Sequence, residues 1–263
     1  MRMKAGLQIL STELLSAYLK TVPPGLEHAF SALHDADIST DAFSFYASVA
    51  SVYSSKIEGE SIELDSYIKY KKFGIEFLPD YTKKTDDLYS AYQFASGRPL
   101  SEANLTLAHQ LLTAHVLPEH LRGVARTNNM YVIDEAGKIE YVAVSPYLVK
   151  VEMEKLYHDL QVLLNAELSF PETMFFAAML HLVFVKIHPW SDGNGRCARL
   201  LEKWFLAEKV GEKAWFLDSE KWYYNNKQAY YASIRAIGND YETLSYSKAL
   251  PFLLMLPASL AAR

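Results

Sequence analysis

Apolar residues recur at helical spacing along most of this chain, and only one pair of short segments has the composition of β-strands. Apolar side chains three and four residues apart lie on one face of a helix, where they can be buried together. The chain is therefore predicted to be mainly α. The helices that we expect cover residues 7–19, 41–58, 62–71, 87–94, 101–115, 146–164, 171–187, 195–210, 227–237 and 247–256.

The strand-like segments lie within residues 130–144. Residues 130–133 and 139–144 are rich in β-branched and aromatic side chains, and residues 134–138 between them include Gly137. Two such runs joined by a short turn that contains glycine are typical of a β-hairpin. We therefore expect a helical body with one hairpin set against it. Taken alone, this hairpin has an equally good explanation as a plain surface feature.

The composition excludes several classes of protein. Half of the 263 residues are hydrophobic and 13% are aromatic, which is enough for a substantial core and argues against disorder. A formal net charge of −5 provides no broad basic surface, so nucleic acid is not an expected partner. The single cysteine, Cys197, rules out an internal disulfide and is best explained as a small packing residue.

The chain shows no predicted targeting or membrane segment. Its first residues lack the apolar block and small-residue cleavage site of a secretory leader. The longest apolar stretch, residues 174–187, includes His181 and Lys186 and is shorter than a bilayer span requires. We expect a cytoplasmic protein without a membrane partner.

The segment richest in chemistry is residues 188–199, His-Pro-Trp-Ser-Asp-Gly-Asn-Gly-Arg-Cys-Ala-Arg. The preceding apolar helix is predicted to end at His188, because the residue before a proline is disfavoured in the helical conformation. The turn Gly193, Asn194 and Gly195 then opens the next helix. Unpaired amides and the positive end of the helix dipole make such a turn a pocket for an anion.

The charged side chains of this segment suit a phosphate group and its metal ion. Arg196 and Arg199 are three residues apart, so both can project from one side of the helix and donate forked hydrogen bonds to phosphate. Asp192 could hold a Mg²⁺ ion that bridges phosphates, and His188 can accept a proton near neutral pH. Each residue alone is more often a cap, a packing residue or part of a solvated face. Together, at this spacing, they indicate a functional site.

The segment resembles the signature of the Fic family, His-Pro-Phe-x-Asp/Glu-Gly-Asn-Gly-Arg-x-x-Arg. The positions that match are His188, Pro189, Asp192, Gly193, Asn194, Gly195, Arg196 and Arg199. The chain departs from the signature at Trp190, where the family has Phe, and this change concerns packing more than chemistry. With the helical pattern and the hairpin, the resemblance extends over residues 40–255.

The resemblance implies a Fic fold, a helical bundle with the hairpin as a flap. An N-terminal helical region, residues 1–100, would contain an inhibitory helix at about 41–58. A Fic core, residues 101–263, would contain the flap, 130–144, and the catalytic loop, 188–199. The N-terminal part could also mediate contacts within a homodimer.

The activity that the resemblance implies is transfer of AMP from ATP to a Ser, Thr or Tyr hydroxyl of a target protein. His188 would be the general base and Asp192 the Mg²⁺ ligand. The amides of residues 193–195, with Asn194, would cradle the phosphates, and Arg196 would steady the leaving pyrophosphate. Positioning and neutralisation of charge supply most of the catalysis in such chemistry.

Two other parts of the chain resemble functional parts of the family. The exposed edge of the flap would pair with an extended segment of the target protein and bring its hydroxyl to the base. Tyr230, Tyr231 and Asn239 resemble the family's nucleobase wall, although a pair of tyrosines in a helix is more often part of the core.

Residues Ser54 to Gly59 match the family's inhibitory pattern, Ser/Thr-x-x-x-Glu-Gly/Asn. Ser54 and Glu58 are four residues apart and would share one helix face. The resemblance implies that Glu58 pairs with Arg199 and leaves ATP in a non-reactive pose. The pattern alone occurs by chance in many helices, but its position upstream of the core supports this role.

Other activities remain open at this stage. Within the family, the chain could transfer another phosphate-containing group, or remove AMP with help from the Glu58 carboxylate. A binding module that holds ATP without catalysis is a different class. A metal hydrolase built on His188 and Asp192 would need more ligands than the sequence places near them.

Overall fold

A computed structural model describes residues 6–33, 42–75, 82–133 and 139–261 of the chain. These residues are mainly helical, with one antiparallel pair of strands, as the sequence predicts. The turn predicted at 134–138 and the first residue of the helix predicted from 41 lie outside the described residues.

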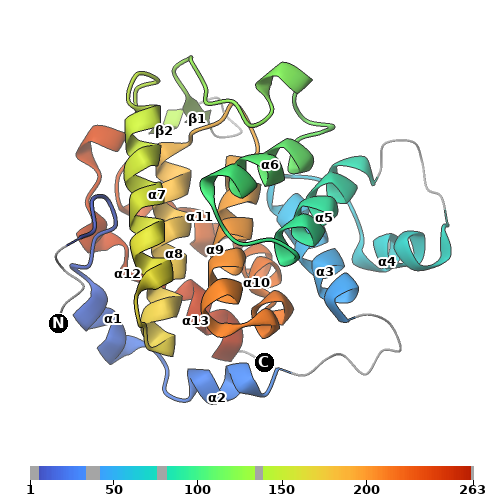
Figure 1. Cartoon of the computed structure of the whole chain (residues 1–263), viewed down its shortest axis with the longest axis horizontal. Helices are drawn as coiled ribbons and strands as arrows, with labels where there is room; N and C mark the ends of the chain where they lie inside the picture. Colours follow the sequence, from blue (N-terminus) through green and yellow to red (C-terminus); the bar gives the residue numbers. More distant parts are fainter. Residues whose placement is uncertain (1–5, 34–41, 76–81, 134–138, 262–263) are drawn as a thin grey trace.

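The α-helices and strands of the described residues are labelled in Figure 1 where space allows. Their bounds are α1 Leu15–Thr21, α2 Leu26–Ser31, α3 Ala42–Ile57, α4 Leu64–Phe73, α5 Lys83–Ser96, α6 Glu102–Leu112, β1 Tyr131–Ile133, β2 Ile139–Val142, α7 Val149–Asn165, α8 Phe170–Ile187, α9 Asn194–Val210, α10 Ser219–Asn225, α11 Lys227–Ala236, α12 Leu250–Leu253 and α13 Met255–Ala261.

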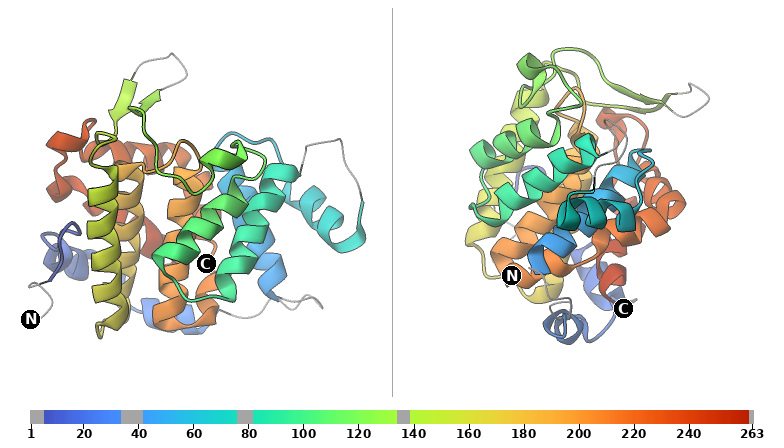
Figure 2. Two further views of the ribbon diagram at one scale, coloured as in Figure 1. Left: turned by 45° about the horizontal axis from the view of Figure 1, so that its top comes forward. Right: turned by 90° about the vertical axis from the view of Figure 1, so that its right-hand side faces the viewer.

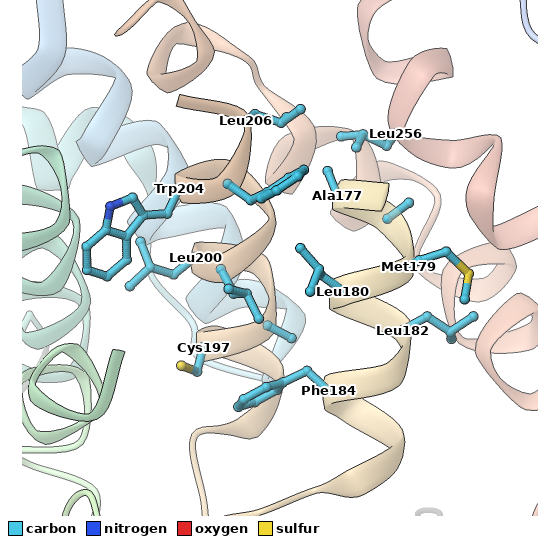
Figure 3. Close-up of a cluster of buried hydrophobic side chains, with 14 of the residues drawn as sticks. Ala177, Met179, Leu180, Leu182, Phe184, Cys197, Leu200, Trp204, Leu206 and Leu256 are labelled. Carbon is cyan, nitrogen blue, oxygen red and sulfur yellow. The ribbon is translucent and has the colours of Figure 1, made fainter. Parts of the chain in front are cut away.

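Helix α8 is the centre of the core. It packs against α9 and α7, and also contacts α1, α2, α12 and α13. In Figure 3, Leu180 and Phe184 extend from α8 toward α9, whereas Met179 and Leu182 extend to its opposite side. All four side chains are buried. A helix that is apolar around its whole circumference is stable in water only when other elements surround it.

The length of α8 corrects one expectation from the sequence. Its 18 residues have a mean hydropathy of 1.5, so it is long and apolar enough to cross a membrane by length and composition alone. The helix is longer than the apolar stretch suggested because it begins at Phe170. Of this span, 83% is buried inside the protein, as in the core helix of a globular domain.

Both ends of α8 follow from local chemistry. Ser169 and Glu172 form a reciprocal capping box at its start, with Pro171 in the first turn. Its last turn gives way to His188, which has a left-handed backbone with φ 54°. Gly193, with φ 79°, is the N-cap residue immediately before α9. The two central helices thus end and begin at one short loop.

The hairpin stands out from one end of the helical body (Figure 2). Tyr131 pairs with Val142 and Val132 with Tyr141, and a register irregularity follows Val132. The backbone N–H of Val142 also donates to the carbonyl of Asn239, at 2.9 Å. The hairpin is therefore anchored to the segment after α11 and lies over that end of the body.

The helix predicted at residues 7–19 is shorter than expected, since α1 covers only Leu15–Thr21. The N–H groups of Gln8, Ile9 and Leu10 donate instead to the buried carboxylate of Asp159 in α7, at 2.6 to 2.8 Å. This carboxylate satisfies the backbone groups in a bent, non-helical segment, so the helical pattern is overridden by a tertiary contact.

Other boundaries also differ. The helix predicted at 247–256 is divided into α12 and α13, and the sequence analysis missed α2 and α10, which have six and seven residues. Elements of two turns are too short to show a helical period. Helix α3 packs against α4, α5, α9 and α10, and the division of the chain near residue 100 stays a prediction.

Candidate active site

A pocket of about 180 Å³ lies between the flap, the end of α8, the start of α9, α3 and α11. Its lining residues are Glu58, Val132, Glu140, Tyr141, Val185, Lys186, His188, Gly195, Arg199, Tyr230, Tyr231, Ile234 and Arg235. The pocket therefore brings His188 and Arg199, the two ends of the predicted catalytic loop, together with Glu58 of the predicted inhibitory pattern.

The ring of His188 has a defined tautomer. Its Nδ1 lies 3.1 Å from the carbonyl oxygen of Val185, which can only accept a hydrogen bond, so Nδ1 carries the proton. Nε2 is then left as the ring's proton acceptor. Burial lowers the pKa of His188, and the positive charge of Arg126 lowers it further against the opposing effects of Val185, Glu58 and Asp192. His188 is therefore neutral at neutral pH and suited to act as a base.

The turn before α9 permits close approach of an anion. The first N–H groups of a helix have no partner within it, and those of α9 open at this turn. A Cβ atom on Gly195 would lie 2.6 Å from Glu58 Oε1, so only glycine leaves the space there. On Gly193, a Cβ atom would lie 2.7 Å from the side chain of Thr113.

The side chain of Asn194 supports this turn from within. Its Oδ1 accepts from the N–H of Trp190 at 2.9 Å, and its Nδ2 donates to the carbonyl of Trp190 at 2.8 Å. Asn194 is 1% exposed. Its side chain therefore shapes the loop, and its backbone N–H is the group that it offers to an anion.

Arg196 and Asp192 lie side by side at the start of α9. Arg196 Nη2 donates to Asp192 Oδ1 at 3.1 Å, and the same oxygen accepts from the N–H of Gly193. Among the described residues, Arg196 Nε is buried without a hydrogen-bond partner. A buried donor that lacks a partner is costly, and a bound phosphate oxygen would satisfy it.

Glu58 pairs with Arg199, as the resemblance implied. Arg199 Nη2 lies 2.6 Å from Glu58 Oε1, and Arg199 Nε donates to Ser54 Oγ at 2.8 Å. The side chain of Arg199 is 1% exposed and that of Glu58 is 31% exposed. Burial opposes both charges, but their attraction and hydrogen bond outweigh it, so the pKa of Glu58 is lowered and that of Arg199 is raised.

A chain of buried polar groups continues behind Arg199. Its Nη1 donates to the hydroxyl of Tyr230 at 3.4 Å, and that hydroxyl lies 2.9 Å from His181 Nε2. His181 Nδ1 lies 2.8 Å from a carboxylate oxygen of Glu202, which also accepts from Tyr223. Because Nδ1 donates to the carboxylate, Nε2 can accept from Tyr230. The hydroxyl of Tyr230 thus serves this network, while its ring lines the pocket.

The other two residues of the predicted nucleobase wall are placed differently from each other. Tyr231 lines the pocket, and its hydroxyl donates to the carbonyl of Ile57 at 3.3 Å. Asn239 is exposed, contributes its carbonyl to the hairpin anchor described above, and is not among the residues that line the pocket.

Sequence reasoning missed Lys186 as a residue of the pocket. Its Nζ donates to the carbonyl of Gly238 at 3.0 Å and lies 4.1 Å from the ring centre of Tyr141. Burial, with a contribution from the charge of Arg235, lowers the pKa of Lys186 to about 8. The sequence feature that could have revealed Lys186 is its position as a charged residue in the apolar stretch 174–187.

His109 was also missed, and it supports the loop from α6. The N–H of Gly123 donates to its Nδ1 at 2.8 Å, so its Nε2 carries the proton and donates to the carbonyl of Asp192 at 2.9 Å. Its ring stacks on Trp190 with centroids 3.8 Å apart. Burial lowers the pKa of His109 to about 4. A histidine on an apolar face gives no sequence signal that separates this role from ordinary packing.

A metal ion at this site would depend on phosphate ligands. Within the described ranges, no group of three or more His, Cys, Asp or Glu side chains could hold one. Asp192 provides one carboxylate, with 51% of its side chain exposed. This fits Mg²⁺, which proteins commonly hold through one or two carboxylates together with substrate phosphates.

Comparison with known proteins agrees with this geometry. Residues 99–206 match the Fic/DOC family. A Fic family protein from Desulfovibrio desulfuricans has a similar structure, with a TM-score of 0.74, 18% identity, and coverage of 95% of this chain and 71% of that one. No curated protein matches the chain.

Two further solved structures are similar. A Fic domain containing signaling protein from Bacteroides thetaiotaomicron has a TM-score of 0.65 at 18% identity, with 95% of this chain and 92% of that chain covered. Fic-1 from C. elegans has a TM-score of 0.66 at 17% identity, with coverage of 95% and 72%. The family match thus covers residues 99–206, and the described chain shares the fold of these solved Fic proteins. Proteins of this family are generally transferases, and they commonly transfer AMP.

Proposed function

We propose that this protein transfers AMP from ATP to a hydroxyl side chain of a target protein, with His188 as the general base. The observation that carries the proposal is the tautomer of His188. Its Nδ1 proton is committed to Val185, so Nε2 is the acceptor, without a hydrogen-bond partner among the described residues, in a pocket that Gly195 and Arg199 also line. A base beside an anion-binding site is an arrangement suited to attack by a hydroxyl on the phosphoanhydride of ATP.

In the proposed reaction, the hydroxyl oxygen of the target attacks the α-phosphorus of ATP. A new oxygen–phosphorus bond forms, while the bond from the α-phosphorus to the bridging oxygen breaks and pyrophosphate leaves with its electron pair. The hydroxyl proton moves to His188 Nε2. The unpartnered Nε of Arg196 and the amides at the start of α9 hold the phosphate oxygens.

A Mg²⁺ ion would be held by Asp192 together with phosphate oxygens of the nucleotide. When bound, it would neutralise charge on the phosphates. The target protein is proposed to dock at the flap, where an extended segment can pair with the outer edge of β1.

We further propose that Glu58 restrains the activity. Its carboxylate is bonded to Arg199 and lies beside Gly195, so it competes with phosphate oxygens for the same arginine. Removing Glu58 frees the guanidinium while Ser54 and Tyr230 still orient it.

The test uses Glu58→Gly and follows label from ATP carrying ³²P at the α- or the γ-phosphate, in lysate and in automodification. Transfer of the α label should rise by about 10- to 100-fold, the factor that corresponds to a coupling of roughly 1.5 to 3 kcal/mol. Glu60→Gly is the matched control, because Glu60 is ion-paired with Lys84 at 2.7 Å, away from Arg199. The variant Glu58→Gly with His188→Ala should transfer no label.

The remaining outcomes decide against parts of the proposal. Equal rates in the wild type and Glu58→Gly would remove the restraint. Transfer of the γ label would show that a phosphate moves instead of AMP. ATP binding without transfer by Glu58→Gly would indicate a binding module, and faster loss of AMP from a modified target in the wild type would indicate the reverse reaction.

A further inference from the structure

Arg126 lies between the flap and the catalytic loop. It is 4% exposed, and every hydrogen-bond acceptor of its guanidinium among the described residues is a backbone carbonyl oxygen. Its Nε donates to the carbonyl of His188 at 2.7 Å, and its Nη2 donates to that of Ile187 at 3.3 Å. These carbonyls end α8, where a helix leaves acceptors without partners and favours positive charge.

The same guanidinium holds both stems of the flap. Its Nη1 donates to the carbonyl of Asn128, just before β1, at 2.9 Å. Its Nη2 donates to the carbonyl of Val144, just after β2. The backbone N–H of Arg126 donates to the carbonyl of Pro189 at 2.9 Å. One side chain thus connects the two ends of the hairpin with the peptide groups on either side of His188.

The backbone of His188 needs such support. Of the described residues other than glycine, His188 alone has a positive φ, at 54°. This conformation costs roughly 1 to 2 kcal/mol and persists only when its surroundings fix it. Bonds from the His188 N–H to Phe184 and from Nδ1 to Val185 fix one side. Arg126 fixes the other.

We propose that Arg126 is a positioning residue for the base. Arg126 holds His188 in its left-handed conformation and couples the stems of the flap to the orientation of the imidazole. The inference rests on the proposed function, because it assigns His188 the role of base. A lysine could not replace the guanidinium, since the four carbonyls require a planar group with several donors in fixed directions.

The charge of Arg126 provides a readout that a purely structural role would not affect. The charged groups that bear on the His188 ring are Arg126, Glu58 just after α3 and Asp192 of the loop. The same pocket is also lined by Glu140, Lys186, Arg199 and Arg235. Arg126 lowers the pKa of His188, so its removal should move the titration of the ring to higher pH.

The experiment compares Arg126→Met and Arg126→Lys in the Glu58→Gly protein. For Arg126→Met, we expect kcat to fall roughly 10- to 100-fold, as for a misplaced catalytic group, with little change in KM for ATP. The midpoint of the acid limb of its pH–rate profile should also move to higher pH. Arg126→Lys keeps the charge and loses the fork, so its kcat should fall without a shift in the midpoint.

The matched control is Arg122→Met. The guanidinium of Arg122 also donates to backbone carbonyls, those of Leu117 and Ala114 at 2.8 and 2.6 Å, and neither of these residues belongs to the flap or the loop. This variant should keep the parental kcat and midpoint. The proposal would be overturned if Arg126→Met kept the parental kcat and the parental His188 titration. If Arg126→Met does not fold, a parental kcat in Arg126→Lys would overturn it.

Nuclear magnetic resonance separates this test from the proposed function. The ring signal of His188, assigned by its loss in His188→Ala, gives the pKa of the ring in the otherwise wild-type protein without any turnover. An upward shift in Arg126→Met supports the positioning role even if Glu58→Gly transfers nothing, an outcome that would refute the proposed function alone. An unchanged His188 titration in Arg126→Met would overturn the positioning role whatever the activity.

Discussion

Gly193 is under two constraints at once. Its φ is 79°, which side chains other than glycine rarely adopt, and an added Cβ atom would lie 2.7 Å from Thr113 and 3.0 Å from Leu112. Gly25 shares only the first constraint, because its φ is 79° and its ψ 8°, close to those of Gly193, and nothing lies within 4 Å of an added Cβ. The pair therefore separates backbone strain from steric overlap.

We expect Gly193→Ala to lower the free energy of unfolding by roughly 2 to 4 kcal/mol, and Gly25→Ala by about 1 kcal/mol. Urea denaturation of both variants measures the difference. Equal losses would mean that the loop relaxes away from α6 and that the overlap has no cost.

His109 should make stability depend on pH. Its pKa is about 4 in the folded protein, below the ordinary value of 6.5, so the unfolded chain binds its proton first as the pH falls. The contribution is complete above pH 6.5 and is lost between pH 6.5 and 4, by roughly 3 kcal/mol in all.

The variant His109→Gln has no such proton to bind. Its free energy of unfolding, measured by urea denaturation across this range, should therefore vary less steeply with pH than that of the wild type. The exposed His120 offers the control, since His120→Gln should leave the slope unchanged. Parallel curves for His109→Gln and the wild type would contradict the assignment.

At the scale of elements, the sequence predicted most helices because their apolar period is local. It predicted α3, α8 and α9 to within a residue or two, since glycine or proline stands at their ends. It failed at residues 7–14, where the carboxylate of Asp159 takes the backbone N–H groups. A contact between segments about 150 residues apart leaves no periodic signal in either of them.

Asp159→Asn tests that anchor. Three N–H groups would lose a charged acceptor, so we expect a loss of about 2 to 4 kcal/mol in the free energy of unfolding. Hydrogen exchange at Gln8, Ile9 and Leu10 should become faster. Glu154→Gln, on the same helix but in an exposed pair with Lys150, should have almost no effect. Unchanged exchange at these three amides would show that other contacts hold the segment.

At the scale of the whole molecule, a buried polar cluster joins two neighbouring helices, α9 and α10, to α5, which is far from them in the sequence. Lys203 of α9 and Glu220 of α10 lie 2.6 Å apart, each with 1% of its side chain exposed. The hydroxyl of Tyr92 in α5 donates to the same carboxylate at 2.6 Å. The ion pair and the tyrosine together fix how α5, α9 and α10 meet.

A double-mutant cycle measures this pair. Lys203→Met leaves a buried carboxylate unpaired and should cost about 3 to 5 kcal/mol, and Glu220→Met should cost a similar amount. The double variant should cost clearly less than the sum, because no lone charge remains in the core. Additive losses in urea denaturation would show that the two charges do not interact.

Several features of the molecule follow from the sequence alone: its mainly helical class, the hairpin, the loop of residues 188–199 and the Ser54 to Gly59 pattern. Each depends on residues close together in the chain, whose dihedral preferences and spacing act locally. Only the tertiary structure placed Glu58 at 2.6 Å from Arg199, 141 residues away, and brought Arg126 between the flap and His188. Such contacts depend on which helices pack together, and a local period does not encode the partner of a buried face.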